Sequence, residues 1–118
     1  NTSIKMKLAD LFGVHAKRLN STFTIGVGDN FYNSGVRSLT DIKWAWYWEG
    51  PFSASSLSHK WYMALGNHDH RGNVEAQIQR TEVDPRWHMP ARRFAQVFCF
   101  QGQRIHLVVL DAEDELKK

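Results

Sequence analysis

The chain has 118 residues, of which 42% are hydrophobic and 23% are charged, and its formal net charge is +3. The length suits one domain with a single core, and the composition argues against disordered and collagen-like classes. No run of residues approaches the ~18 apolar residues of a membrane-spanning helix. The basic residues are dispersed along the chain, so we expect no nucleic-acid partner.

The first predicted element is an amphipathic helix over residues 4–19, because apolar residues recur there at steps of three, four and seven. The residues on or near its apolar face are Ile4, Leu8, Leu11, Phe12 and Leu19. Gly13 costs about 1 kcal/mol inside a helix, yet the periodicity continues past it.

Two short strands are each followed by a glycine and a polar loop. Residues 22–27 are β-branched and apolar and end at Gly28-Asp29-Asn30, whereas residues 61–65 end at Gly66-Asn67-His68-Asp69-His70. A helix, a strand and a polar loop in this order are typical of an α/β sheet. Since ligands of such sheets gather at the carboxyl ends of the strands, the two loops are candidates for a functional site.

The segment between the two strands is rich in tryptophan. Residues 40–50 hold Trp44, Trp46 and Trp48, which predicts either a strand face or a loop folded over a pocket. The tryptophans serve either in packing or as a wall that faces the substrate. Residues 51–59 are rich in proline, serine and alanine and are predicted to form a loop or a short helix.

The last third of the chain is predicted to contain a helix over residues 73–80, a loop over 85–90 and a hairpin. The hairpin strands are residues 94–100 and 104–110, joined by a turn around a glycine. The second of them ends at Asp111, which makes a third polar strand end.

The single cysteine, Cys99, cannot form an intrachain disulfide. It stands in the apolar run Val97-Phe98-Cys99-Phe100. We therefore expect a buried structural cysteine rather than a reactive one, since free cysteine behaves as a small hydrophobic residue.

The residue types in the two loops suit a metal site. The carboxylate of Asp29 is a hard ligand that can bridge two ions, and a tyrosine such as Tyr32, with a pKa of about 10, binds as phenolate only to a strong Lewis acid such as Fe³⁺. Asn67 offers a neutral oxygen and His68 a proton donor or phosphate contact. The alternatives are an Asx-turn aspartate, a packed or surface tyrosine, and structural histidines. Two metals a few ångströms apart suit the hydrolysis of phosphate esters.

Both loops also resemble motifs of a known family. Gly28-Asp29-Asn30-Phe31-Tyr32 resembles the second motif of the purple acid phosphatases, and Gly66-Asn67-His68-Asp69-His70 resembles their third. Asp84-Pro85-Arg86-Trp87 and the strand from Leu107 to Asp111 resemble the next segments of the small, tartrate-resistant type. These enzymes are part of the calcineurin-like metallophosphoesterase superfamily.

The resemblance implies an α/β fold, namely a portion of a metallophosphoesterase α-β-β-α sandwich with mixed sheets. It implies that Asp29 bridges two metals, that Tyr32 binds the ferric ion and that Asn67 binds the second metal. His68 is implied to contact the phosphate and to help protonate the leaving group. The family's first metal motif and its later histidine motifs have no counterpart in the chain, so residues 1–118 are expected to be a partial, internal segment of the domain.

The function implied is that of an acid phosphatase with a dinuclear centre of Fe³⁺ with Fe²⁺, Zn²⁺ or Mn²⁺. Small phosphate esters are the implied substrates, with phosphoproteins as further candidates, and a secreted or lysosomal location is implied. The segment alone is expected to have little activity, because it holds fewer than half of the family's ligands. Two alternatives are a calcineurin-like phosphodiesterase and a non-catalytic phosphatase-like binding protein.

Overall fold

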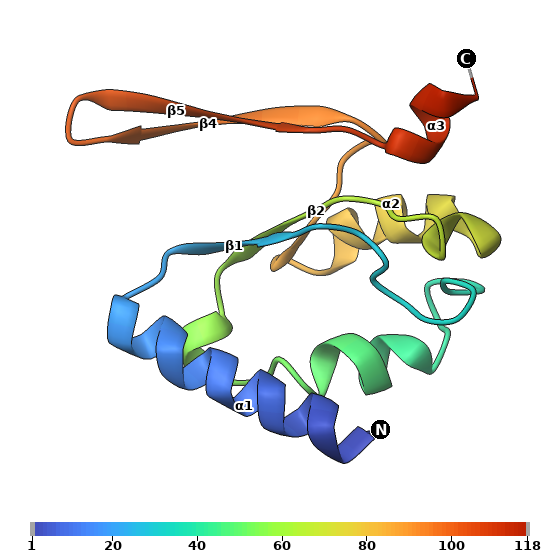
Figure 1. Cartoon of the computed structure of the whole chain (residues 1–118), viewed down its shortest axis with the longest axis horizontal. Helices are drawn as coiled ribbons and strands as arrows, with labels where there is room; N and C mark the ends of the chain where they lie inside the picture. The colour runs from blue at the N-terminus through green and yellow to red at the C-terminus, as the bar shows by residue number, and fades with distance from the viewer. Residues whose placement is uncertain (1, 118) are drawn as a thin grey trace.

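The computed structural model describes residues 2–117. Helix α1 (Thr2–Leu19) lies on one side of a small parallel sheet, and the hairpin of β4 (Phe94–Phe100) and β5 (Gln103–Val109) lies on the other (Figure 1). Helix α2 (Val74–Val83) lies beside the sheet. Within the described residues, no helix is both long enough and apolar enough to cross a membrane.

The parallel sheet has the strand order β1-β2-β3. Strands β1 (Phe23–Gly26) and β2 (Lys60–Met63) confirm the two strands predicted from the sequence. Strand β3 (Trp87–His88) pairs with β2, so the prediction of a plain loop over residues 85–90 was wrong. The Trp87 side chain is buried and donates its indole N–H to the carbonyl of Gln77 at 2.8 Å, which fixes this short strand against α2.

Helix α1 confirms the predicted helix, but its buried residues differ from the predicted apolar face, of which Phe12 still packs edge-on against Trp61 with ring centres 5.8 Å apart. Its buried residues are small, namely Ala9, Gly13 and Ala16. A Cβ at Gly13 would lie 2.9 Å from the Cβ of Ala54, and the Gly13 carbonyl accepts the Ser56 hydroxyl at 2.6 Å. The glycine therefore permits a close approach that a larger residue would prevent. The apolar residues named from the periodicity are all exposed, namely Ile4, Leu8, Leu11, Phe12 and Leu19.

The tryptophan segment forms a π-helical turn, η1 (Trp44–Glu49), so both predictions for it, a strand face and a loop, were wrong. The Gly50 N–H reaches the carbonyl of Ala45 at 2.9 Å, which is the five-residue step of a π-helix. Trp44 and Trp48 are buried with their ring centres 4.9 and 5.2 Å from that of Trp87. The packing interpretation holds for these two residues, whereas Trp46 is exposed.

The remaining predicted elements are present. A 3₁₀ turn, η2 (Ser55–Leu57), lies in the segment expected to be a loop or short helix, and α2 covers the helix predicted over 73–80. The hairpin β4–β5 is confirmed, and its inward-facing Phe98 stacks on Phe23 with ring centres 4.3 Å apart. A short helix, α3 (Ala112–Leu116), follows.

Cys99 is exposed, so the expectation of a buried cysteine was wrong. Successive side chains of a strand point to opposite faces, and Cys99 points away from the face on which Phe98 stacks. Among the described residues, no element covers that outer face of the hairpin.

Candidate active site

The loops after β1 and β2 meet at the carboxyl edge of the sheet, as the parallel pairing requires. Gly28 has a φ of +103°, and a Cβ there would lie 3.0 Å from the backbone nitrogen of Gly66. A Cβ at Gly66 would in turn overlap the backbone nitrogen and the carboxylate of Asp29. Both glycines are therefore needed for the close contact between the loops.

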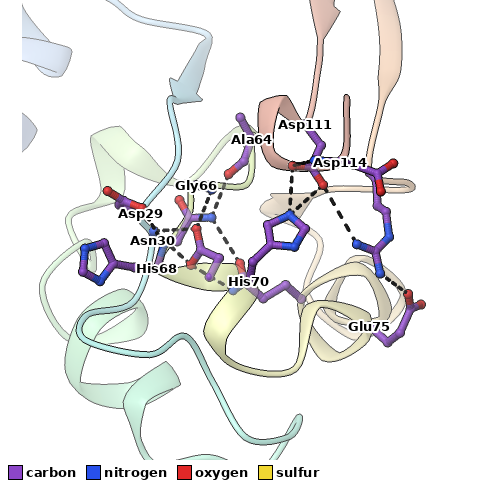
Figure 2. A network of polar contacts seen from close by, with 12 residues as sticks. Asp29, Asn30, Ala64, Gly66, His68, His70, Glu75, Asp111 and Asp114 are labelled. Atoms are coloured by element: carbon purple, nitrogen blue, oxygen red, sulfur yellow. Dashed lines mark hydrogen bonds and ion pairs between the residues drawn. The ribbon is translucent and has the colours of Figure 1, made fainter. Parts of the chain in front are cut away.

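The buried carboxylate of Asp69 holds the two loops together. It accepts the backbone N–H groups of Asn30 at 3.1 Å and Phe31 at 3.2 Å from the first loop, and that of Gly66 at 2.9 Å from the second. The side-chain amide of Gln77, from α2, donates to it at 3.0 Å. The Asn30 amide nitrogen also reaches the Ala64 carbonyl at 2.9 Å, and Figure 2 shows this network from close by.

Asp29, Tyr32 and His68 are in contact with one another. One Asp29 oxygen accepts the Tyr32 hydroxyl at 3.1 Å, and the other accepts the backbone N–H of His68 at 3.1 Å. The hydrogen bond to Asp29, partial burial and the negative charges of Asp29 and Asp69 raise the pKa of Tyr32. The tyrosine is thus a neutral donor in this arrangement, and only a strong Lewis acid would convert it to a phenolate.

One cavity of about 540 Å³ brings together all three residues expected to bind metal, Asp29, Tyr32 and Asn67. Their donor atoms are oxygens, which suits hard cations. Within residues 2–117 there is no group of three or more His, Cys, Asp or Glu that could hold a metal ion. The residues therefore fit a metal centre in the kind of ligand they offer, while supplying only part of a ligand set.

The imidazole of His68 lies against the loop that carries Tyr32. Its Nδ1 lies 2.6 Å from the carbonyl oxygen of Asn33, and its ring centre lies 4.6 Å from that of Tyr32. Because a carbonyl oxygen only accepts, this short contact assigns a proton to Nδ1, and Nε2 can donate to a phosphate oxygen only when it carries a proton as well.

A second polar contact in this region was not predicted from the sequence. The Nε2 of His70 lies 2.8 and 2.9 Å from the two carboxylate oxygens of the buried Asp111, which caps α3 (Figure 2). Arg92 lies 4.0 Å from Asp111 and pairs with Glu75 at 3.2 Å. The sequence signal that could have indicated this contact was Asp111, the polar residue at the third predicted polar strand end. The contact ties the hairpin and α3 to the loop after β2.

Comparison with known proteins identifies relatives of the chain. It is 41% identical over 92 residues to the tartrate-resistant acid phosphatase type 5 of Oryctolagus cuniculus, which covers 77% of this chain and 28% of that protein. It is 37% identical over 110 residues to the Sus scrofa counterpart, covering 92% of this chain and 32% of that protein. Purple acid phosphatase 7 of Arabidopsis thaliana is 42% identical over 82 residues, which are 68% of this chain and 25% of that protein. The chain is thus similar to part of several purple acid phosphatases.

The chain spans between a quarter and a third of the length of these relatives. Its mixture of helices, parallel strands and an antiparallel hairpin confirms the predicted α/β class and is consistent with part of a metallophosphoesterase domain. A solved structure described as GAP50, the anchor in the inner membrane complex of Plasmodium, superimposes with a TM-score of 0.75 at 25% identity. The superposition covers 88% of this chain and 35% of the solved structure's chain. No model of a protein family matches the chain.

Proposed function

We propose that this chain is an internal part of an acid phosphatase that hydrolyses phosphate monoesters, and that residues 1–118 form part of its metallophosphoesterase domain. The observation that carries the proposal is the convergence of Asp29, Tyr32 and Asn67 on one cavity, in a chain similar to purple acid phosphatases. Small phosphate esters are the proposed substrates, with phosphoproteins as further candidates, and the proposed location is secreted or lysosomal.

In this proposal Asp29, Tyr32 and Asn67 hold a dinuclear centre of Fe³⁺ with Fe²⁺, Zn²⁺ or Mn²⁺. When bound, such a pair supplies Lewis-acid stabilisation of the charge that develops on the phosphate. Asp29 also orients the second loop, since its carboxylate accepts the backbone N–H of His68. His68, fixed by its contact with Asn33, contacts the phosphate and donates a proton to the leaving group through Nε2.

A non-catalytic binding protein is the second candidate function. It is favoured by the similarity to a structure whose description calls it an anchor. A calcineurin-like phosphodiesterase is an alternative within the enzyme class, because Gly66-Asn67-His68-Asp69 alone does not separate it from the purple type.

The test is metal analysis and visible absorption of the full-length protein, with Tyr32→Phe beside the control Tyr47→Phe. Tyr47 lies near Phe31, at 6.4 Å between ring centres, and does not line the cavity of Asp29, Tyr32 and Asn67, although it lines a neighbouring cavity with Asp29 and Tyr32. We expect two metals per chain, hydrolysis of p-nitrophenyl phosphate at acid pH, and a visible band that Tyr32→Phe abolishes and Tyr47→Phe keeps. A metal-free protein would favour the binding function, and a colourless metal enzyme would favour the phosphodiesterase. The 118 residues alone should be nearly inactive.

A further inference from the structure

A second cavity lies next to the candidate active site and shares no lining residue with it. Its volume is about 630 Å³, and its walls come from residues 33–37, from Lys43 and from residues 71–73. We call it the basic cavity, because Arg37, Lys43 and Arg71 all line it. The proposed phosphatase function, as argued above, uses none of these three side chains.

Two of the three cations are held in place by neighbouring oxygens. The ammonium of Lys43 donates to the carbonyl of Gly35 at 2.9 Å. The Nη1 of Arg71 lies 3.4 Å from the side-chain oxygen of Asn33 and 3.2 Å from Nδ1 of His68. Arg71 therefore touches the histidine proposed to contact the phosphate and also lines the basic cavity.

The positive charge of the basic cavity is largely uncompensated. Arg80, Arg92 and Arg93 are in ion pairs, whereas none of the three cavity cations forms one within residues 2–117. The carboxylate of Asp41 interacts electrostatically with Lys43 and Arg37, but it does not line the cavity.

Asp41 offsets only part of the positive charge of the basic cavity, because its one carboxylate interacts with two of the three cations, Lys43 and Arg37. Its oxygens accept the backbone N–H groups of Arg37 at 2.7 Å and Lys43 at 3.0 Å. Burial acts to raise the pKa of Asp41, but these hydrogen bonds and the charges of Lys43 and Arg37 outweigh it and lower that pKa. One carboxylate thus offsets the charge of at most one of the three cations that line the cavity.

We infer that the basic cavity binds a second phosphate group of the substrate while the phosphate to be cleaved lies at His68. The inference rests on the proposed phosphatase function and names its preferred substrates as those that carry two phosphate groups. The planar guanidinium forks of Arg37 and Arg71 match the oxygens of a phosphate, and the Lys43 ammonium adds a point charge. Because Arg71 lines the basic cavity and lies 3.2 Å from Nδ1 of His68, the cavity adjoins the histidine that is proposed to contact the phosphate.

The experiment is a titration of the isotope-labelled full-length protein, prepared without metal, with inorganic pyrophosphate and with orthophosphate, followed by NMR. The test variant is Arg37→Gln with Arg71→Gln, and the matched control is Arg18→Gln with Arg104→Gln, at two exposed arginines outside the cavity. Both double variants remove the same charge, and their amide spectra report whether they are folded.

We expect pyrophosphate to shift the signals of Arg37, Arg71 and His68 and to bind about tenfold more tightly than orthophosphate. The test variant should lose about tenfold in pyrophosphate affinity, and the control variant less than about twofold. Equal losses in both variants, equal affinities for the two anions, or shifts confined to other residues would overturn the inference. No metal or turnover is involved, so such a failure leaves the phosphatase proposal intact. Conversely, a full-length protein without metal would contradict the phosphatase proposal but would not change the measured affinity for pyrophosphate.

Discussion

Replacing Asp69 with asparagine should loosen both loops of the candidate site at once. Asp69 is fully buried, and its carboxylate accepts hydrogen bonds from Asn30, Phe31, Gly66 and Gln77. An asparagine has the same shape, but it offers one acceptor oxygen and places an N–H₂ group where the other oxygen was.

The stability lost in Asp69→Asn depends on which carboxylate oxygen is replaced by the amide nitrogen. Phe31 and Gln77 donate to Oδ1, Gly66 donates to Oδ2, and Asn30 reaches both. The cheaper orientation puts the amide nitrogen at Oδ2, so that Gly66 loses its acceptor and faces another donor. An unsatisfied buried donor costs about 1–3 kcal/mol, and the bonds that remain lose their charge assistance. We therefore expect a destabilisation of about 2–4 kcal/mol.

Urea unfolding of the 118-residue chain measures this difference. For a slope of about 2 kcal/mol per molar, the midpoint should fall by about 1–2 M. The matched control is Asp10→Asn, which makes the same atomic change at an exposed position of α1 and should stay within about 0.5 kcal/mol of the unmodified chain. A midpoint for Asp69→Asn indistinguishable from that of Asp10→Asn would refute the reasoning.

Two further predictions concern Asp84 and Gly66. Burial acts to raise the pKa of Asp84. This effect is outweighed by hydrogen bonds from Trp48 and Arg86 and by the charge and hydrogen bonds of Arg80, so the pKa is lowered. Its stabilising contribution is therefore present above the unfolded value of about 3.9 and is lost as the pH falls through the lower folded value. Unfolding of Asp84→Asn and the unmodified chain in urea should differ at pH ~6 and converge below about pH 3, and a constant difference would contradict this. Gly66→Ala should displace Asp29 and weaken iron binding by about tenfold or more, measured by the visible band of the full-length protein. Gly102→Asn, at a turn where no atom lies within 4 Å, should leave the band unchanged, and equal iron affinities would argue against the close contact.

The strand ends of the candidate site were predictable because their signal is local. A buried strand, a glycine and a polar cluster follow one another in sequence, and the parallel pairing of β1 and β2 then brings Asp29 and Asn67 to the same edge. The assignment of metals and of a proton donor to these side chains remains a prediction.

The errors arose where the tertiary environment decides the outcome. Hydrophobic periodicity does not reveal that α1 packs through Ala9, Gly13 and Ala16, because what matters there is how closely the backbone can approach. Cys99 lies in an apolar run, but the uncovered outer face of the hairpin leaves it exposed. The contact of His70 with Asp111 joins residues far apart in sequence, so no local spacing of residues predicts it.

The parallel sheet also bears on the order in which the chain folds. Its registers join Phe23 to Lys60 and Trp61 to Trp87, whereas the hairpin joins Phe100 to Gln103 across one turn. A hairpin closes in about 1–10 μs, while non-local pairing must first overcome the entropy of closing a long loop. The edge that carries Asp29 and Asn67 therefore forms late. Until it does, the apolar strands β1 and β2 are open to association with other unfolded chains.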